Sequence, residues 1–184
     1  MKKLLFIALF SISALAVSAQ NNTSQSYIDQ FKDNAINIMH ETGVPASIIL
    51  AVAMHESGNG NSAIAKKLNN QFGIKGYNTV VYYKNKKKVR TSYKKYESVW
   101  ASFADFARVM TERKQFSHLA DKFTQYDYKG WAKGIQRSGY CSSKRWASQV
   151  MAIINRYDLD ELDKTPEPQA AAPATKEIAQ NTDK

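Results

Sequence analysis

The run ASIILAVAMHES, residues 46–57, is the most apolar segment of this 184-residue chain after its N-terminal end. A helix formed by this run would be apolar on nearly all of its faces, which is typical of a helix buried at the centre of a domain. Pro45 suits the first turn of such a helix, and Gly58 is a residue that commonly follows the last one. The run therefore predicts a central helix that carries one acidic side chain, Glu56, in its last turn.

Helical patterns lie on both sides of this central segment. Upstream, Ser26 and Asp29 resemble a capping box in front of an amphipathic run that ends at Gly43. A last helix with one apolar stripe is expected over about residues 144–157. The other expected helices share a residue that can cap the first turn: Ser62, Ser98 and Asp127. Together these patterns predict a mostly helical domain.

The segment after the third helical pattern has a different composition. Residues 79–84 and 88–96 are rich in tyrosine and β-branched side chains and flank the tripeptide NKK. Such paired runs around a short polar connection are typical of a β-hairpin. The sequence thus predicts an α+β domain that is mostly helical, with one small hairpin inserted after its third helix.

The first nineteen residues have the pattern of a secretory signal peptide. Lys2 and Lys3 precede an apolar run, and small residues at Val17-Ser18-Ala19 stand before Gln20. The alternative is an uncleaved anchor, but the run is short for a bilayer span of roughly 20 residues. We expect a secreted or periplasmic protein, cleaved near Ala19, with no stable membrane anchor.

The composition changes again near the C-terminal end. Residues 165–184 hold three of the four prolines of the chain and keep no helical or alternating pattern. We therefore expect a signal peptide at residues 1–19, one folded domain at 20–162 and a disordered tail at 163–184. The length fits a single domain, and we expect it to act as a monomer.

Basic residues outnumber acidic ones, with 26 Lys and Arg against 16 Asp and Glu, giving a formal net charge of +10. Ten of the basic residues lie between positions 57 and 96, where no acidic residue occurs. This charge indicates an anionic partner, such as nucleic acid, a membrane surface or an acidic polymer. Export argues against nucleic acid.

Few residues of the chain have the chemistry to hold a cofactor. The single cysteine, Cys141, excludes an intramolecular disulfide and a cysteine-rich zinc site. The three histidines, His40, His55 and His118, show no metal-ligand spacing. We expect neither a metal nor another cofactor.

Glu56 is the residue with the clearest catalytic potential. Its apolar neighbours and the negative end of its helix should both raise the pKa of its carboxyl group. A carboxylic acid that stays protonated near neutral pH can act as a general acid. The alternative is an ordinary glutamate at the end of a helix, exposed or held in an ion pair.

Three motifs occur in order along the chain: ESGNGNSAIAKKLNNQFGIKG (56–76), KKYESVWASFADFARVM (94–110) and SGYCSSKRWASQVMAIINRYDL (138–159). Over about residues 43–159 they resemble the bacterial cell-wall endo-β-N-acetylglucosaminidases of glycoside hydrolase family 73. The resemblance implies a lysozyme-like α+β fold with a cleft between the helical body and the hairpin lobe. It also implies a secreted autolysin-type enzyme that cleaves the β-1,4 bond between N-acetylglucosamine and N-acetylmuramic acid in peptidoglycan. Glu56 aligns with the general acid of the family.

A second carboxylate is missing from the place where a glycosidase often has one. No acidic residue lies between Glu56 and Glu97, and Glu97 precedes a helix cap, for which a structural role is favoured. The simplest remaining mechanism is substrate-assisted, with the 2-acetamido oxygen attacking the anomeric carbon while Glu56 protonates the leaving oxygen. Tyr140, which aligns with a turn tyrosine of the family, is the candidate for orienting the acetamide. The alternative for Tyr140 is a role in the core or in a cap.

The candidates for substrate binding lie in the NNQFGIKG run and around the hairpin: Asn70, Phe72, Lys75, Tyr77 and Tyr96. Aromatic faces suit the C–H surfaces of sugars, and hydroxyl groups suit sugar oxygens. Phe72 and Lys75 are expected in the cleft wall. Asn70 is expected chiefly to hold its loop through backbone hydrogen bonds, with a sugar contact in addition. For the tyrosines, the alternative is packing within the hairpin.

Two other functions remain open at the level of sequence. A lytic transglycosylase or muramidase would share the lysozyme-like fold and the single glutamate. A catalytically inactive module that binds the cell wall would need no second carboxylate. In each case the expected partner is the glycan strand of peptidoglycan.

Overall fold

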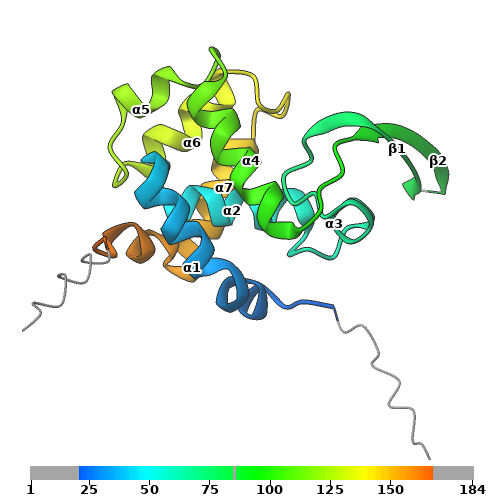
Figure 1. Cartoon of the computed structure of the whole chain (residues 1–184), viewed down its shortest axis with the longest axis horizontal. Helices are drawn as coiled ribbons and strands as arrows, with labels where there is room; N and C mark the ends of the chain where they lie inside the picture. The colour runs from blue at the N-terminus through cyan, green and yellow to red at the C-terminus, as the bar shows by residue number, and fades with distance from the viewer. Residues whose placement is uncertain (1–20, 85, 168–184) are drawn as a thin grey trace, which may run out of the picture.

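The computed structural model describes residues 21–84 and 86–167 (Figure 1). The predicted signal peptide and most of the predicted tail therefore lie outside the described residues. The elements, in chain order, are α1 (Ser24–Thr42), α2 (Ala46–Ser57), α3 (Ala63–Leu68), β1 (Lys75–Lys84), β2 (Lys87–Tyr93), α4 (Val99–Glu112), α5 (His118–Lys122), α6 (Tyr128–Arg137), α7 (Trp146–Tyr157) and the 3-10 helix η1 (Leu159–Lys164). Within these two stretches, no helix has the length and apolar character that crossing a membrane requires.

The helix α2 lies at the centre of the helical body, as its apolar sequence predicts (Figure 1). The helices α1, α4, α6, α7 and η1 all pack against it. Ile48, Ile49 and Leu50 have no exposed surface, and burying each such side chain contributes about 1.5–3 kcal/mol relative to leaving it in water. Gly58 ends α2 in the left-handed conformation, at φ 59°, which a glycine adopts without steric cost. The end of the best-packed helix therefore has a fixed place, and Glu56 lies in its last turn.

The capping box expected at Ser26 and Asp29 is wrong, because α1 begins earlier. Thr23 is the N-cap residue: its hydroxyl accepts from the backbone N–H of Ser26 at 3.1 Å. In return, the Ser26 hydroxyl accepts from the backbone N–H of Thr23 at 2.9 Å. Serine can thus take the reciprocal place that glutamate usually has in a capping box. The preceding residue is held by Asn61, whose side-chain oxygen accepts from the backbone N–H of Asn22 at 3.0 Å.

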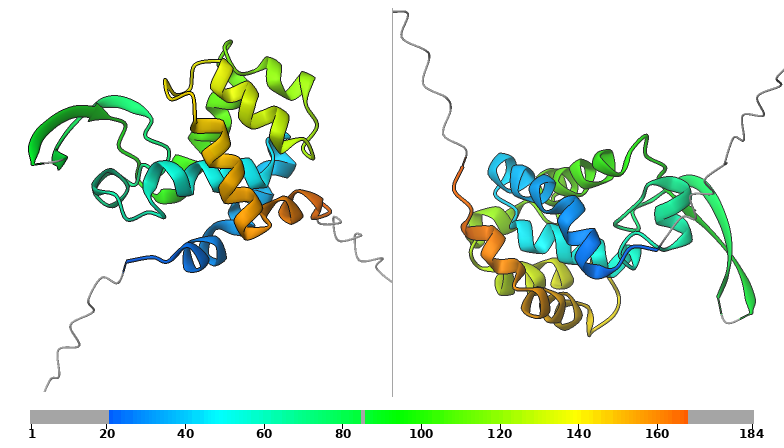
Figure 2. Two further views of the ribbon diagram at one scale, coloured as in Figure 1. Left: turned by 180° about the vertical axis from the view of Figure 1, so that it is seen from behind. Right: turned by 90° about the horizontal axis from the view of Figure 1, so that it is seen from below.

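The two strands form an antiparallel hairpin that extends away from the helical body (Figures 1 and 2). The hairpin after the third helix is confirmed, but β1 begins at Lys75, earlier than expected, and β2 already ends at Tyr93. The pairing register shifts between Lys75 and Asn78. The sequence of such an irregular stretch does not alternate between apolar and polar residues, which is why the first residues of β1 were not predicted. Beyond β2 the backbone turns toward the body, where the N–H of Tyr96 donates to the carbonyl of Leu68 at 2.9 Å.

The short elements α5 and η1 have no counterpart in the sequence prediction, and η1 carries the folded region past residue 162, where we placed its end. Asp163, only 1% exposed, accepts from the backbone N–H of Ser47 at 2.8 Å and from its hydroxyl at 2.6 Å. Burial raises the pKa of Asp163 to about 6. The C-terminal element therefore supplies the side-chain cap that Pro45 cannot give to α2.

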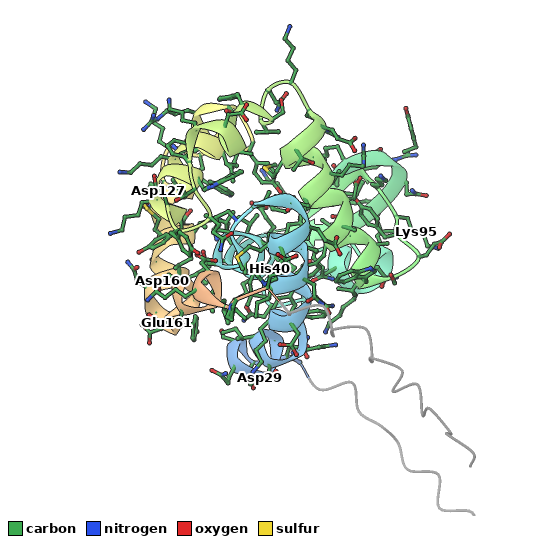
Figure 3. All side chains as sticks on the ribbon, turned by 60° about the vertical axis from the view of Figure 1, so that its left-hand side comes forward. Asp29, His40, Lys95, Asp127, Asp160 and Glu161 are labelled. Atoms are coloured by element: carbon green, nitrogen blue, oxygen red, sulfur yellow. The ribbon has the colours of Figure 1, made fainter. Side chains whose placement is uncertain are left out.

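Exposed charges lie around the outside of the body (Figure 3). Asp127 and Glu161 lie at the edge of the helical body, whereas Lys95 lies on the side of the hairpin. The segment between residues 57 and 96, which includes the hairpin, contributes basic side chains and no acidic ones.

Candidate active site

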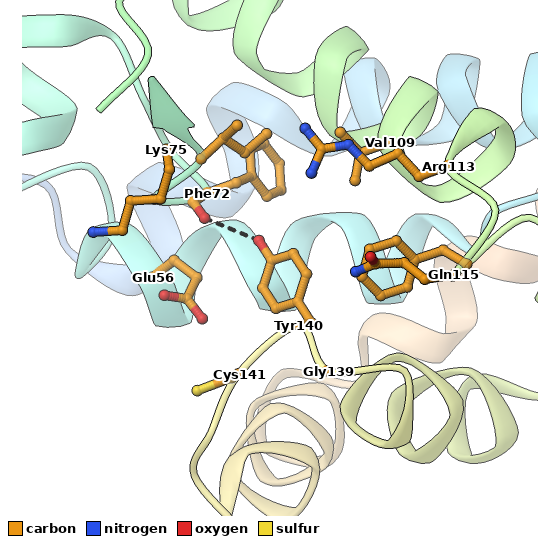
Figure 4. Close-up of a pocket in the computed structure, with 12 residues that line it drawn as sticks. Glu56, Phe72, Lys75, Val109, Arg113, Gln115, Gly139, Tyr140 and Cys141 are labelled. Carbon is orange, nitrogen blue, oxygen red and sulfur yellow. Dashed lines mark hydrogen bonds between the residues drawn. The ribbon is translucent and has the colours of Figure 1, made fainter. Parts of the chain in front are cut away.

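A cavity of about 250 Å³ opens beside the last turn of α2 (Figure 4). Its walls come from α2, the loop that leads into β1, the end of α4 with the following loop, and the turn before α7. The lining residues are Glu56, Phe72, Gly73, Ile74, Lys75, Val109, Arg113, Gln115, Phe116, Gly139, Tyr140 and Cys141. The three separate sequence motifs therefore meet at one place.

Glu56 is half-buried in this wall. The indole nitrogen of Trp146, the first residue of α7, donates a hydrogen bond to Glu56 Oε1 at 2.7 Å. The other oxygen, Oε2, faces Gly73, where a Cβ atom would lie 3.7 Å away. One carboxylate oxygen is thus held by the helical body, and the other borders the loop that lines the cavity.

Tyr140 joins the turn before α7 to the loop before β1. Its hydroxyl donates to the carbonyl oxygen of Phe72 at 2.9 Å, and its ring packs against Trp146 with the centroids 5.3 Å apart. Burial, together with the nearby negative charge of Glu56, raises the pKa of Tyr140 well above its ordinary value. Tyr140 therefore stays a neutral phenol whose proton is directed at a backbone carbonyl.

Asn70 and Phe72 were both predicted to contact substrate. Phe72 lines the cavity, and Asn70 does not. Phe72 stacks on Phe106 at a centroid distance of 4.3 Å, which fixes the carbonyl that Tyr140 contacts. Asn70 is 1% exposed, and its amide donates to the carbonyls of Ile74 and Lys94 at 2.9 and 2.8 Å. Its oxygen accepts from the N–H of Ile74 at 3.1 Å. These bonds to the backbone correspond to the loop-holding role that was chiefly expected of Asn70.

The three remaining candidates lie in different surroundings. Lys75 lines the cavity, and its ammonium group lies 3.1 Å from Thr91 Oγ1. Tyr77 is fully exposed, in the irregular part of β1, and does not line the cavity. Tyr96 is buried, and its hydroxyl donates to Asp105 Oδ2 at 2.6 Å. Tyr96 therefore packs at the base of the hairpin, which is the alternative role that the sequence left open for the tyrosines.

Several residues of the site were not predicted. Arg113 and Gln115 follow α4 and lie on the side of the cavity away from Glu56 (Figure 4). Their exposed, polar stretch has no periodic pattern that would have marked it. Trp146 falls within the apolar stripe of the last expected helix, although a buried indole N–H needs an acceptor. That requirement was the available signal that Trp146 contacts a polar group.

A second carboxylate is absent from the described residues of the cavity wall. Among the lining residues that the structure describes, Glu56 is the one carboxylate. Glu97 is exposed and lies before Ser98, the N-cap residue of α4, as its structural interpretation requires. Residues 21–84 and 86–167 also contain no cluster of His, Cys, Asp or Glu that could hold a metal ion.

Comparisons with known proteins agree on one family. A family model described as Glucosaminidase, mannosyl-glycoprotein endo-beta-N-acetylglucosaminidase, matches residues 32–159. The chain is 32% identical over 151 residues to the exo-glucosaminidase LytG of Bacillus subtilis, covering 76% of this chain and 54% of LytG. It is 24% identical over 163 residues to the peptidoglycan hydrolase FlgJ of Vibrio cholerae, covering 81% of this chain and 48% of FlgJ. The chain therefore spans about half the length of these curated relatives.

A solved structure shows the same fold. The catalytic domain of the autolysin Auto from Listeria monocytogenes superimposes with a TM-score of 0.63 at 23% identity, covering 85% of this chain and 99% of that domain. At this identity the likeness concerns the fold alone.

Proposed function

Because the chain belongs to the glucosaminidase family, glycoside hydrolase family 73, we propose that it hydrolyses the β-1,4 bond between N-acetylglucosamine and N-acetylmuramic acid in peptidoglycan. Membership confirms the resemblance seen in the motifs and the lysozyme-like α+β fold class. The observation that carries the proposal is the position of Glu56, fixed by Trp146 in the wall of the cavity. We also propose export, with residues 1–19 as the signal peptide.

Glu56 acts in this proposal as the general acid. Its proton passes to the glycosidic oxygen as the bond from that oxygen to the anomeric carbon breaks. The carbonyl oxygen of the 2-acetamido group attacks the anomeric carbon, so the positive charge is shared with the amide. Water then opens the resulting ring, giving up a proton to the Glu56 carboxylate. The single carboxylate of the described cavity wall supports this substrate-assisted route.

Tyr140 orients the acetamide in this scheme. Its proton is engaged by the carbonyl of Phe72, but the phenolic oxygen keeps lone pairs that can accept a hydrogen bond. The N–H of the acetamide is a donor that could occupy one of them. Accepting from that N–H would hold the amide oxygen toward the anomeric carbon. The raised pKa of Tyr140 keeps this acceptor uncharged.

Product analysis tests the proposed function. Purified peptidoglycan is digested with the wild-type chain, the products are reduced with borohydride, and the new ends are identified by mass spectrometry. We expect reduced N-acetylglucosamine at the new ends. Products ending in 1,6-anhydro-N-acetylmuramic acid would instead identify a lytic transglycosylase. Binding to the wall without any cleavage would identify an inactive binding module.

The hairpin supports an anionic glycan as the partner. Lys86, Lys87, Lys88 and Arg90 are exposed near its tip, and none of them belongs to an ion pair among the described residues. An uncompensated cluster of this kind increases the rate of encounter with a polyanion. We propose that it steers the carboxylate-bearing peptidoglycan strand to the cavity.

Neutralising the hairpin tip should slow the enzyme mainly at low salt. Replacing Lys86, Lys87 and Lys88 with glutamine should lower the initial rate of peptidoglycan clearing about 3- to 10-fold at low ionic strength. The difference should shrink toward high salt, because screening shortens the range of charge interactions. The matched control replaces Lys129, Lys133 and Lys144, exposed on and after α6. An equal loss in both triple variants would show that net charge, not the hairpin, is responsible.

A further inference from the structure

We propose that Trp146 is a positioning residue for catalysis: its indole N–H holds Glu56 Oε1 so that the transferable proton resides on Oε2, beside Gly73. This inference rests on the proposed function, because it assigns a task within the same site. It also explains why an aromatic residue with a polar edge lies at the start of α7, in a stripe that packing alone would fill with aliphatic side chains.

The assignment of the proton follows from hydrogen-bond chemistry. An indole N–H is a donor and never an acceptor. The oxygen that it contacts, Glu56 Oε1 at 2.7 Å, must therefore act as an acceptor in both protonation states of the acid. In a protonated carboxyl group the carbonyl oxygen is a better acceptor than the hydroxyl oxygen. The indole N–H on Oε1 therefore favours the state in which the O–H of Glu56 is on Oε2.

The location of Oε2 suits proton transfer to a substrate. Gly73 has φ +64°, and a Cβ atom there would come within 3.7 Å of Oε2. Because glycine has no side chain, the space in front of Oε2 stays open on the side where Gly73 lines the cavity. Among the described residues, the indole of Trp146 is the one side chain that donates to Glu56. Removing it would leave the carboxyl group free to rotate.

Trp146 is itself rigidly placed. It is 1% exposed and packs on the ring of Tyr140. The start of α7 is fixed by Gln136 of α6, whose side-chain oxygen accepts from the backbone N–H of Ala147 at 2.8 Å. The amide of the same Gln136 donates to the carbonyl of Lys144 at 3.0 Å. A chain of contacts from α6 through α7 thus sets the direction of the Glu56 carboxyl group.

The test compares Trp146→Phe with Trp131→Phe. Trp131 is 0% exposed, and its indole donates to the carbonyl of Thr124 at 3.2 Å, outside the cavity wall. Both changes remove the same volume and one indole hydrogen bond. We expect Trp146→Phe to lower kcat on peptidoglycan about 10- to 100-fold with little change in KM, because misplacing a catalytic group costs rate more than binding. Trp131→Phe should stay within about 3-fold, while both variants lose thermal stability to a similar extent.

A second variant separates hydrogen bonding from packing. In Trp146→His, the Nε2 atom of the imidazole ring occupies nearly the position of the indole nitrogen and can still donate a proton. Histidine fills less volume than phenylalanine, so a packing role predicts that Trp146→His is the worse enzyme. A positioning role predicts that Trp146→His has the higher kcat. Thermal unfolding of each variant establishes that it is folded before rates are compared.

The outcomes distinguish the two proposals. If the wild-type chain does not cleave peptidoglycan, the proposed function fails. If the wild type cleaves and Trp146→Phe keeps the kcat of Trp131→Phe, the function stands and the positioning role of Trp146 is overturned. A loss in Trp146→Phe that Trp146→His does not reduce would also overturn it.

Discussion

Glu56→Gln is expected to lower kcat on peptidoglycan by about 10²- to 10⁴-fold, the usual contribution of a general acid. The amide has the shape of the carboxyl group, and its oxygen can still accept the hydrogen bond from Trp146. It has no acidic proton to give to the leaving oxygen. We therefore expect an intact fold, with an unchanged thermal unfolding midpoint, and the loss of wall clearing measured by turbidity.

The matched control is Glu97→Gln, which makes the same chemical change outside the cavity. Glu97 is exposed at the start of α4, so its variant should keep activity within about 2-fold of the wild type. If Glu97→Gln lost activity as completely as Glu56→Gln with its fold intact, the substrate-assisted route would be contradicted. A second carboxylate would then have to reach the reacting sugar, which requires movement of the hairpin base.

The sequence predicted those parts of the fold in which local signals and packing agree. The apolar run at residues 46–57 is buried, and Ser62, Ser98 and Asp127 each cap a helix. The predicted start of α1 was wrong because Thr23 and Ser26 form the capping box. Threonine and serine at this spacing are also common in loops, so they do not mark the start of a helix. The 3-10 helix η1 was missed because Asp163 is held by Ser47, at a separation of 116 residues. No local pattern records a contact over that distance.

The residues of the candidate site also divide into those that local motifs predict and those that only tertiary contacts determine. Glu56, Phe72, Lys75 and Tyr140 line the cavity, and all of them lie in motifs that the sequence displays. Tyr96 belongs to the same kind of motif but is turned inward, because its hydroxyl reaches Asp105 on α4. The sequence around a tyrosine beside a hairpin does not reveal whether its ring points toward the core or toward the cavity. The direction is set by tertiary contacts, which also bring Trp146 to Glu56 across 90 positions of the chain.

The contact between Tyr96 and Asp105 is part of a network that fastens the hairpin to the body. Asp105 is 7% exposed and accepts from Tyr96 at 2.6 Å, from Lys94 at 3.0 Å and from two nitrogens of Arg108 at 3.0 and 2.6 Å. Burial alone would raise the pKa of Asp105. The hydrogen bonds from Tyr96, Lys94 and Arg108 outweigh burial and hold the pKa below its ordinary value. The folded state therefore favours the ionised carboxylate.

Asp105→Ala is expected to lower the free energy of unfolding by about 3 kcal/mol at pH 7, because it leaves the buried hydroxyl of Tyr96 without its acceptor. The folded pKa of Asp105 is depressed, so its stabilisation is present above the ordinary carboxyl pKa of about 4. That stabilisation is lost as the pH falls through the lower folded value. Urea unfolding at pH 7 and below pH 4 should thus show a large difference between variant and wild type that shrinks in acid.

A double-mutant cycle with Tyr96→Phe identifies the source of the effect. Phenylalanine keeps the buried ring and removes the hydroxyl, so the cost of Asp105→Ala should be smaller in the Tyr96→Phe background than in the wild type. Asp121→Ala, an exposed change on α5, should alter stability by less than about 0.5 kcal/mol. Equal costs of Asp105→Ala in both backgrounds would show that Tyr96 and Asp105 act independently. The base of the hairpin, and with it the Lys75 wall of the cavity, would then depend on two other contacts. These are the side-chain amide of Asn70, which donates to the carbonyl of Lys94, and the carbonyl of Leu68, which accepts from the N–H of Tyr96.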